Sequence, residues 1–172
     1  MKNCIIGLGN PGDKYKGSRH NAGFDLVDIF VKDNNLEDFS FSEKINAEIS
    51  QNQNLVIIKP HSFMNLSGIV VKKTIKKFGI KPENIIVVHD DIDIEIGKIK
   101  ISKDSGPAGH RGVASIIKEI GTKDFTRIRI GILPNTKPEE VSDFVLKKFT
   151  TEEKELLNKI YLEALKELNK WI

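Results

Sequence analysis

Residues 3–12 of the chain read NCIIGLGNPG, an apolar run that leads into three closely spaced glycines. The spacing of Gly7, Gly9 and Gly12 fits the G-x-G-x-x-G pattern, which binds dinucleotides where a strand turns directly into a helix. The run before Gly7 is typical of a buried parallel strand. The residues that follow decide whether the glycines have that meaning.

No helix is predicted directly after these glycines. Pro11 favours an extended Asn10, and residues 13–21 (DKYKGSRHN) are polar, without apolar residues at helical spacing. A helical pattern begins only at Phe24, with Asn21 as its possible cap. The glycines are therefore interpreted as opening a long polar loop at the carboxyl end of the first strand. A nucleotide-dependent oxidoreductase is kept as an alternative.

Outside this segment the chain alternates strand-like and helix-like patterns. Further strands are predicted at residues 46–51, 54–60, 84–90, 97–102 and 126–132. Helices are predicted after Asn21, Ser67 and His110 and over a C-terminal segment that opens on a capping box at residues 150–153. The last two strands alternate apolar and basic residues, as strands with one exposed face do. We expect an α/β fold: a single-domain sandwich of residues 1–172 with a twisted, mixed but mostly parallel central sheet flanked by helices.

The composition is that of an ordinary globular protein. A net charge of +3 permits a nucleic-acid partner without requiring one. Cys4 is the only cysteine, so no internal disulfide forms, and its apolar surroundings predict a buried, inert thiol. The sequence has no signal-like apolar stretch and no run of membrane-spanning length, so we expect a cytoplasmic protein without a membrane partner.

Polar side chains gather where the predicted strands end. In an α/β sheet the site lies beyond the carboxyl ends of the parallel strands. The chemically capable side chains near that edge are Asn10, His20, Asn65, Asp90 and His110. A histidine with a carboxylate and carboxamides suits hydrolysis by an activated water. The sequence lacks a cysteine pair and H-E-x-x-H, so the ligand spacing of such metal sites is absent, and it lacks G-x-S-x-G, so no nucleophilic serine is predicted.

The acidic stretch VVHDDID at residues 87–93 permits three interpretations. Asp90, Asp91 and Asp93 offer carboxylates that suit Mg²⁺. Asp90 alone can instead orient a histidine and stabilise its cationic form. The acids can also simply cap a turn. Spacing does not decide between these interpretations, and a lone loop histidine such as His20 is equally ambiguous.

Five segments together resemble the bacterial-type peptidyl-tRNA hydrolase family. They are GLGNPGDKYKGSRHNAGF (7–24), KPHSFMNLSG (59–68), VVHDDIDIEIGKIKIS (87–102), SGPAGHRG (105–112) and RIRIGI (127–132). They follow the family's order and spacing over most of the chain. The resemblance implies hydrolysis of the ester between a peptide and the 3′-terminal ribose of tRNA, which recycles tRNA from prematurely released peptidyl-tRNA. It implies peptidyl-tRNA as partner, no cofactor, and a monomer.

The resemblance also implies roles for individual residues. His20 matches the catalytic histidine that takes a proton from water, and Asp90 matches the acid that orients it. Asn10 matches the position that helps to distinguish N-blocked from free aminoacyl-tRNA. Further contacts with the substrate are implied at Tyr15, Phe63 and Asn65.

Basic residues are the remaining candidates for contacts with tRNA. Arg111 stands where the family usually has asparagine, and we expect it to reach the substrate or a phosphate although arginine offers only donors. Arg129, with Lys100 or Lys103, is a candidate for contact with the tRNA backbone, since Arg127 and Arg129 share one face of a strand. The alternative for that face is simple exposure to solvent.

Two other functions are carried as alternatives to this hydrolase. A non-catalytic RNA-binding relative would keep the fold without turnover, but the joint presence of Asn10, His20, Asn65 and Asp90 disfavours it. An amidase of the aminopeptidase kind is less well supported, because no pair of metal sites is visible in the sequence.

Overall fold

The computed structural model describes residues 2–172, and a seven-stranded sheet forms its centre. The strands are β1 (Asn3–Gly7), β2 (Ser40–Ser42), β3 (Ala47–Gln51), β4 (Leu55–Pro60), β5 (Ile85–Glu95), β6 (Ile99–Lys103) and β7 (Thr126–Leu133), in the order β2-β3-β4-β1-β5-β7-β6. The central strands β4, β1, β5 and β7 pair in parallel. Antiparallel pairs occur only toward the two edges, at β2–β3, β3–β4 and β6–β7. The predicted mixed, mostly parallel sheet is confirmed.

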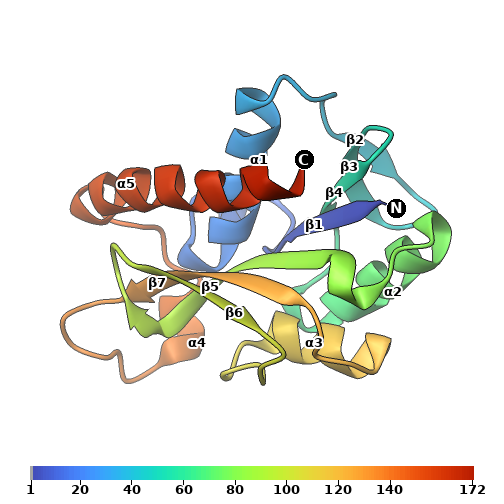
Figure 1. The fold of residues 1–172 in the computed structure, drawn as a ribbon. Coiled ribbons are helices and arrows are strands. Elements are labelled where there is room, and N and C mark those ends of the chain that lie inside the picture. Colours follow the sequence, from blue (N-terminus) through green and yellow to red (C-terminus); the bar gives the residue numbers. More distant parts are fainter. Residues whose placement is uncertain (1) are drawn as a thin grey trace.

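Helices cover both faces of this sheet (Figure 1). They are α1 (Ala22–Asp33), α2 (Ser67–Phe78), α3 (Arg111–Ile120), the short α4 (Val141–Phe144) and α5 (Thr151–Leu168). Four 3₁₀ turns of the described residues lie between strands and helices: η1 (Asp13–Tyr15), η2 (Arg19–Asn21), η3 (Met64–Leu66) and η4 (Pro82–Asn84). A fifth, η5 (Asn169–Trp171), directly follows α5. Helices α1 and α5 lie on one face, and α2 and α3 lie on the other. The result is the flanked α/β sandwich that the sequence predicts.

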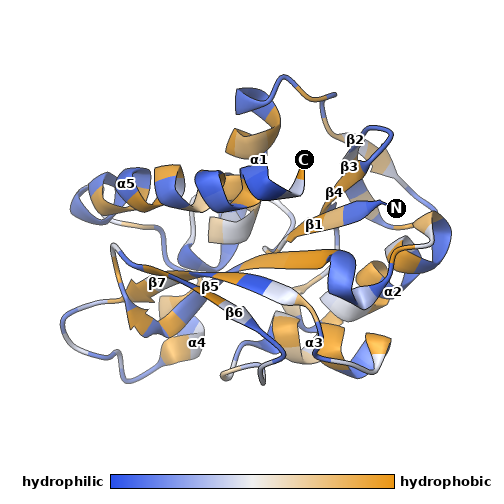
Figure 2. Cartoon of the chain, in the orientation of Figure 1, coloured by the Kyte–Doolittle hydropathy of each residue, from blue (hydrophilic) through white to orange (hydrophobic). Residues whose placement is uncertain are grey.

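Successive residues of the central strands point to opposite faces, so the sheet separates two cores. On β1, Ile5 packs into the core under α1 and α5, while Cys4 and Ile6 pack into the core under α2 and α3. Strands β1 and β4 and the first half of β5 are accordingly mostly apolar (Figure 2). Cys4 is fully buried, and burial raises the pKa of its thiol to about 12. The prediction of a buried, unreactive cysteine is confirmed.

The predicted strands and the four longer helices all form, and the differences are local. The capping box at residues 150–153 is present. Asn21 does sit at the N-cap of α1, but its side chain makes no cap, because it is bonded to the backbone of Asn10 instead. The prediction of Asn21 as a cap is therefore wrong. β2 and α4 were not predicted, since three or four residues give no detectable period.

The glycines of the first loop allow β1 to lie directly against α1. A Cβ on Gly7 would lie 2.6 Å from the carbonyl oxygen of Gly23 and 2.7 Å from the Val27 side chain. A Cβ on Gly9 would lie 2.7 Å from the ring of Phe24. Residues 8–21 contain only two 3₁₀ turns before α1 begins. The glycines thus serve close packing, and the strand–turn–helix context of a dinucleotide site is absent there.

We predict that Gly23→Ala destabilises the protein by about 3 kcal/mol or more. A Cβ at Gly23 would collide with backbone atoms of Leu8 and Val88, which the sheet holds in place. Urea unfolding measures the loss. Gly106→Ala is the control, because a Cβ there meets no atom within 4 Å, and it should change the free energy of unfolding by no more than about 0.5 kcal/mol. Equal stability of the two variants would contradict this account of the packing.

Candidate active site

The polar side chains that the sequence places at the ends of strands meet around one cavity. This cavity has a volume of about 770 Å³ and lies at the carboxyl edge of β1, β4 and β5. Its lining includes Asn10, Tyr15, His20, Phe63, Asn65, Asp90 and Arg111. The cavity therefore lies at the edge of the sheet where the sequence places the candidate site.

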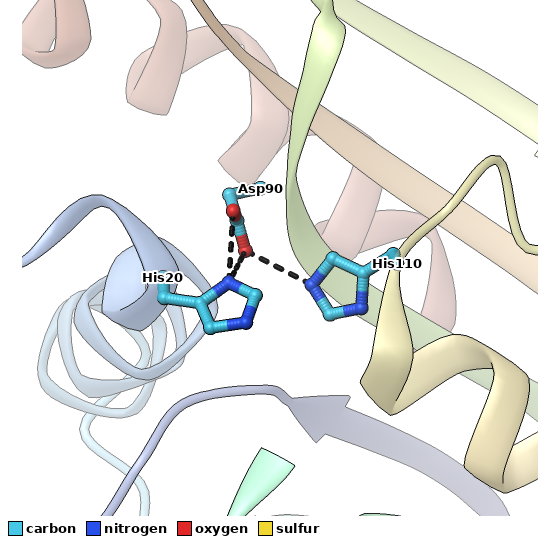
Figure 3. A group of neighbouring side chains, drawn as sticks. All are labelled: His20, Asp90 and His110. Atoms are coloured by element: carbon cyan, nitrogen blue, oxygen red, sulfur yellow. Dashed lines mark hydrogen bonds and ion pairs between the residues drawn. The ribbon is translucent and has the colours of Figure 1, made fainter. Parts of the chain in front are cut away.

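His20 and Asp90 both line the cavity, and their side chains point toward one another (Figure 3). His20 lies in η2, and its Nδ1 is 2.8 Å and 3.0 Å from the two carboxylate oxygens of Asp90 on β5. Because a carboxylate only accepts, Nδ1 must carry the proton, and a neutral ring then keeps a lone pair on Nε2. Nε2 of His20 has no partner among residues 2–172. The arrangement leaves a free base at the cavity.

Asp90 is held as a carboxylate although it is buried. Burial by itself raises its pKa, but the two neighbouring imidazoles, His20 and His110, outweigh burial through charge and hydrogen bonding. The pKa of Asp90 is consequently well below its ordinary value. The ionised carboxylate can then stabilise an imidazolium at His20.

His110 is a second imidazole on the same carboxylate; the sequence placed it near the site edge but assigned it no role. It is the N-cap of α3, where its Nδ1 accepts hydrogen bonds from the backbone N–H groups of Gly112 and Val113 at 3.1 Å and 3.3 Å. Nδ1 therefore carries the lone pair, and Nε2–H donates to Asp90 over 3.0 Å. The available signal was the histidine directly before a predicted helix, but its partner lies twenty residues earlier in the chain.

The contacts of the acidic stretch favour the orienting role of Asp90 over a metal site. His20, Asp90 and His110 do offer ligand atoms within 4.8 Å of one another. Their nitrogens that face Asp90 carry protons, however, so ligation would require both hydrogen bonds to break. Asp91 is bonded to Arg129 at 2.7 Å, and Asp93 lies 3.5 Å from the Lys137 ammonium group.

Asn10 presents an amide N–H₂ group to the same cavity. Its side-chain oxygen accepts a hydrogen bond from the backbone N–H of Met64 at 2.9 Å. Its backbone N–H and C=O both bond to the side chain of Asn21, at 2.9 Å and 3.0 Å. With the oxygen engaged, the amide nitrogen is the group left for a ligand. Asn10 is only 6% exposed, so the fold fixes this orientation.

The other predicted contacts stand around the mouth of the cavity. Phe63 and Asn65 flank Met64 near η3, and Phe63 is 59% exposed. Tyr15 lies opposite, at the end of η1, and is half-buried. Arg111 is exposed at the start of α3 and makes no ion pair or side-chain hydrogen bond within residues 2–172. These four side chains are free to meet a ligand.

The remaining wall of the cavity, residues 141–146, is held against η2 by Arg19. The guanidinium donates to the carbonyl groups of Lys147 and Lys148, at 3.1 Å each, and to Glu153 at 2.6 Å. It also stacks 4.0 Å from the ring centre of Phe144. The next residue, His20, donates its backbone N–H to Val145 over 2.8 Å. The turn that carries His20 and this wall are therefore one packed unit.

The basic strand β7 is not the exposed face that its alternation predicts. Arg127 is 1% exposed, and it donates to Ser105 and to the carbonyl of Gly106 in the loop that covers it. The side chain of Arg129 is 12% exposed and is bonded to Asp91. The expectation of an exposed face on this strand is wrong, because loop 104–110 and Asp91 enclose it. Lys100 and Lys103 on β6 do lie at the surface and lie outside the cavity lining.

Comparison with known proteins agrees with this geometry. A family model described as peptidyl-tRNA hydrolase matches residues 4–172. The peptidyl-tRNA hydrolase of Sulfurihydrogenibium sp. is 45% identical over 166 residues, covering 95% of this chain and 87% of that protein. That of Thermodesulfovibrio yellowstonii is 45% identical over 170 residues, covering 95% and 89%. The crystal structure of peptidyl-tRNA hydrolase from Acinetobacter baumannii superposes with a TM-score of 0.90 at 32% identity, covering 98% of this chain and 87% of that one.

The fold and the site define the class: an α/β protein with a mostly parallel sheet and a buried carboxylate bonded to an imidazole at an open cavity. Within that class, the chain belongs to the peptidyl-tRNA hydrolase family. Among residues 2–172, no helix combines the length and apolarity needed to cross a bilayer.

We predict that Asp90 makes stability depend on pH in acid. Since its folded-state pKa is lowered, its contribution is fully present above its ordinary pKa, near 4, and is lost as the pH falls through the folded value. At pH 7, Asp90→Asn should lower the free energy of unfolding by about 2 to 4 kcal/mol, and the deficit should shrink below pH 4. Urea unfolding at several pH values measures it, with the exposed Asp33→Asn as control. A deficit independent of pH would refute the assignment.

Proposed function

We propose that this chain hydrolyses the ester bond between an N-blocked peptide and the 3′-terminal ribose of tRNA, and so recycles tRNA from prematurely released peptidyl-tRNA. One observation carries the proposal: in a chain of this family, His20 has its Nδ1–H on Asp90 and its Nε2 free at an open cavity. Relatives named peptidyl-tRNA hydrolase align over nearly the whole chain.

In the proposed reaction water is the nucleophile. Nε2 of His20 removes a proton from water as the oxygen attacks the ester carbonyl carbon, and Asp90 stabilises the imidazolium that forms. The tetrahedral intermediate then collapses and the bond to the ribose oxygen breaks. The imidazolium returns its proton to that oxygen, which leaves a free 3′-hydroxyl and a peptide carboxylic acid. Side chains and water supply every group that this scheme uses.

Asn10 supplies a donor that is already oriented for this reaction. Its oxygen is engaged by Met64, so its amide N–H₂ can donate to an acceptor on the substrate without reorganisation. Amide carbonyls of an N-blocked peptide are acceptors, whereas a free α-ammonium group is a donor and would oppose the N–H₂ group. Asn10 therefore favours peptidyl over aminoacyl substrates, with Tyr15, Phe63 and Asn65 as further contacts around the reacting end.

The remaining parts of the proposal are the contacts with tRNA, the oligomeric state and the location in the cell. Exposed Lys100 and Lys103 can contact phosphates, while Arg129 supports that region from within, through Asp91. We propose one catalytic domain that works as a monomer, because the catalytic groups all come from a single chain. Because the substrate belongs to translation, the proposed location is the cytoplasm.

The decisive measurement is release of the acyl group from N-acetyl-aminoacyl-tRNA. His20→Ala should lower kcat/KM by about a hundred- to ten-thousandfold, because the water loses its base. His61→Ala is the matched control, since His61 is exposed and lies outside the cavity lining, and it should retain full activity. Equal rates for wild type and His20→Ala would refute the catalytic assignment of His20, whereas no release above background by the wild type would favour a non-catalytic RNA-binding protein.

We predict that Arg111→Asn keeps kcat/KM within about tenfold of wild type, or about 1.4 kcal/mol. Arg111 is exposed and bonds to no other side chain in the described structure, so its replacement leaves His20, Asp90 and His110 in place. An unchanged unfolding midpoint confirms that the fold is intact. A loss much larger than tenfold would show that arginine has an essential role in this site.

A further inference from the structure

The two faces of the sheet differ sharply in charge. Helices α2 and α3, on one face, carry six cationic side chains and one carboxylate. Helices α1 and α5, on the opposite face, carry four lysines and eight carboxylates. The chain as a whole has a net charge of only +3, so this contrast is a separation of charge between the faces. A polyanion is attracted to the α2–α3 face and repelled from the other.

Most of this positive charge lies on α2. Lys72, Lys73, Lys76 and Lys77 are all exposed, and α2 contains no acidic residue. Within residues 2–172 these lysines form one weak ion pair, between Lys72 and Glu119 at 3.4 Å. We call these four residues the α2 lysine stripe. Its members are three to five residues apart or adjacent, so they share one side of the helix.

The stripe leads away from the active site. Helix α2 begins at Ser67, directly after η3, which borders the cavity, and α3 begins at Arg111 in the cavity lining. The start of α2 lies against the middle of α3, since a Cβ on Gly68 would collide with the backbone of Ser115. At 1.5 Å per residue, the stripe lies ~8 to ~15 Å along α2 from Ser67. When the 3′ end of a tRNA is held in the cavity, the nucleotides next to it can reach the stripe over this distance.

We propose that the α2 lysine stripe is a docking surface for the phosphate backbone of the tRNA part of the substrate. The inference rests on the proposed function, and it concerns a surface separate from β6. The stripe binds phosphates without reading bases, so it raises affinity for any tRNA body. It plays no part in bond cleavage, because its ammonium groups lie outside the cavity lining. Its effect therefore belongs in KM and not in kcat.

The test compares two substrates and two matched variants. One substrate is full-length N-acetyl-aminoacyl-tRNA, and the other is an N-acetyl-aminoacyl ester of a short CCA oligonucleotide. In one variant, Lys72, Lys73, Lys76 and Lys77 are changed to Gln. In the control, Lys154, Lys159, Lys166 and Lys170, which are exposed on α5 and η5, are changed to Gln. Both variants lose four positive charges, so net charge alone cannot separate them.

The stripe variant should lose about tenfold in kcat/KM on full-length substrate through a higher KM, with a weaker dependence on salt. Its activity on the short ester should be unchanged, and the α5 control should behave as wild type on both. Equal activity of the two variants on full-length substrate would overturn the inference. Equal losses on both substrates would also overturn it, because the lysines would then act on the cavity.

Two other outcomes identify where an error lies. If the stripe variant keeps its activity on full-length substrate but loses binding to a bare RNA duplex, the surface serves another RNA and the inference fails. If the wild type cleaves neither substrate, the proposed function fails, and this inference fails with it. Cleavage of the short ester by wild type separates the two cases.

Discussion

The site depends on one buried carboxylate that accepts hydrogen bonds from two imidazoles. Asp90 draws together segments of the chain that are far apart in sequence, the loop after β1 and the start of α3. Each contact also fixes a tautomer, because a carboxylate accepts only N–H. The lone pair of His110 is used by α3, and that of His20 is the one left at the cavity. A single charge thus determines which nitrogen can act as a base.

This base is useful only if its ring cannot turn away from the cavity, and three separate contacts restrain it. Asp90 holds Nδ1, Val145 accepts the backbone N–H of His20, and the preceding Arg19 is bonded to Glu153 at the start of α5. Glu153 also accepts the backbone N–H of Thr150 in the capping box of α5. The geometry of the base is therefore tied to the C-terminal helix as well as to the sheet.

The sequence predicts the part of this site that follows from topology. Alternating strands and helices place the carboxyl ends of β1, β4 and β5 at one edge, and His20, Asp90 and Asn10 follow from that placement. What it does not predict depends on contacts across the fold. A histidine at an N-cap has no visible partner in the sequence, so the bond between His110 and Asp90 could not be foreseen. The side chain of Asn21 likewise does not cap α1, because it is bonded to the backbone of Asn10.

The same dependence on contacts across the fold explains why the sequence did not predict the burial of the basic residues on β7. Alternation of arginine with isoleucine is identical for a face in solvent and for a face covered by a loop, so β7 gave no sign that residues 104–110 enclose Arg127. The two arginines can be buried on this strand because each has hydrogen-bond partners. Asp91 accepts from Arg129, and Ser105 and the carbonyl of Gly106 accept from Arg127. Hydrophobic patterning predicts where a strand lies in the sheet but not what covers its polar side.

The pairing of Arg129 with Asp91 also reduces the negative charge that the cavity presents to its substrate. Four aspartates line it, Asp90, Asp91, Asp93 and Asp143, and unpaired carboxylates there would repel a polyanionic substrate. Asp90 is engaged by two imidazoles, Asp91 by Arg129, and Asp93 by Lys137. Three of the four carboxylates therefore meet the cavity already paired with a donor or a cation, and only Asp143 has no such partner within residues 2–172. Arg129 lies beneath the surface and neutralises Asp91 there. Phosphates can therefore approach a cavity lined by carboxylates, and the basic helices α2 and α3 begin beside this cavity.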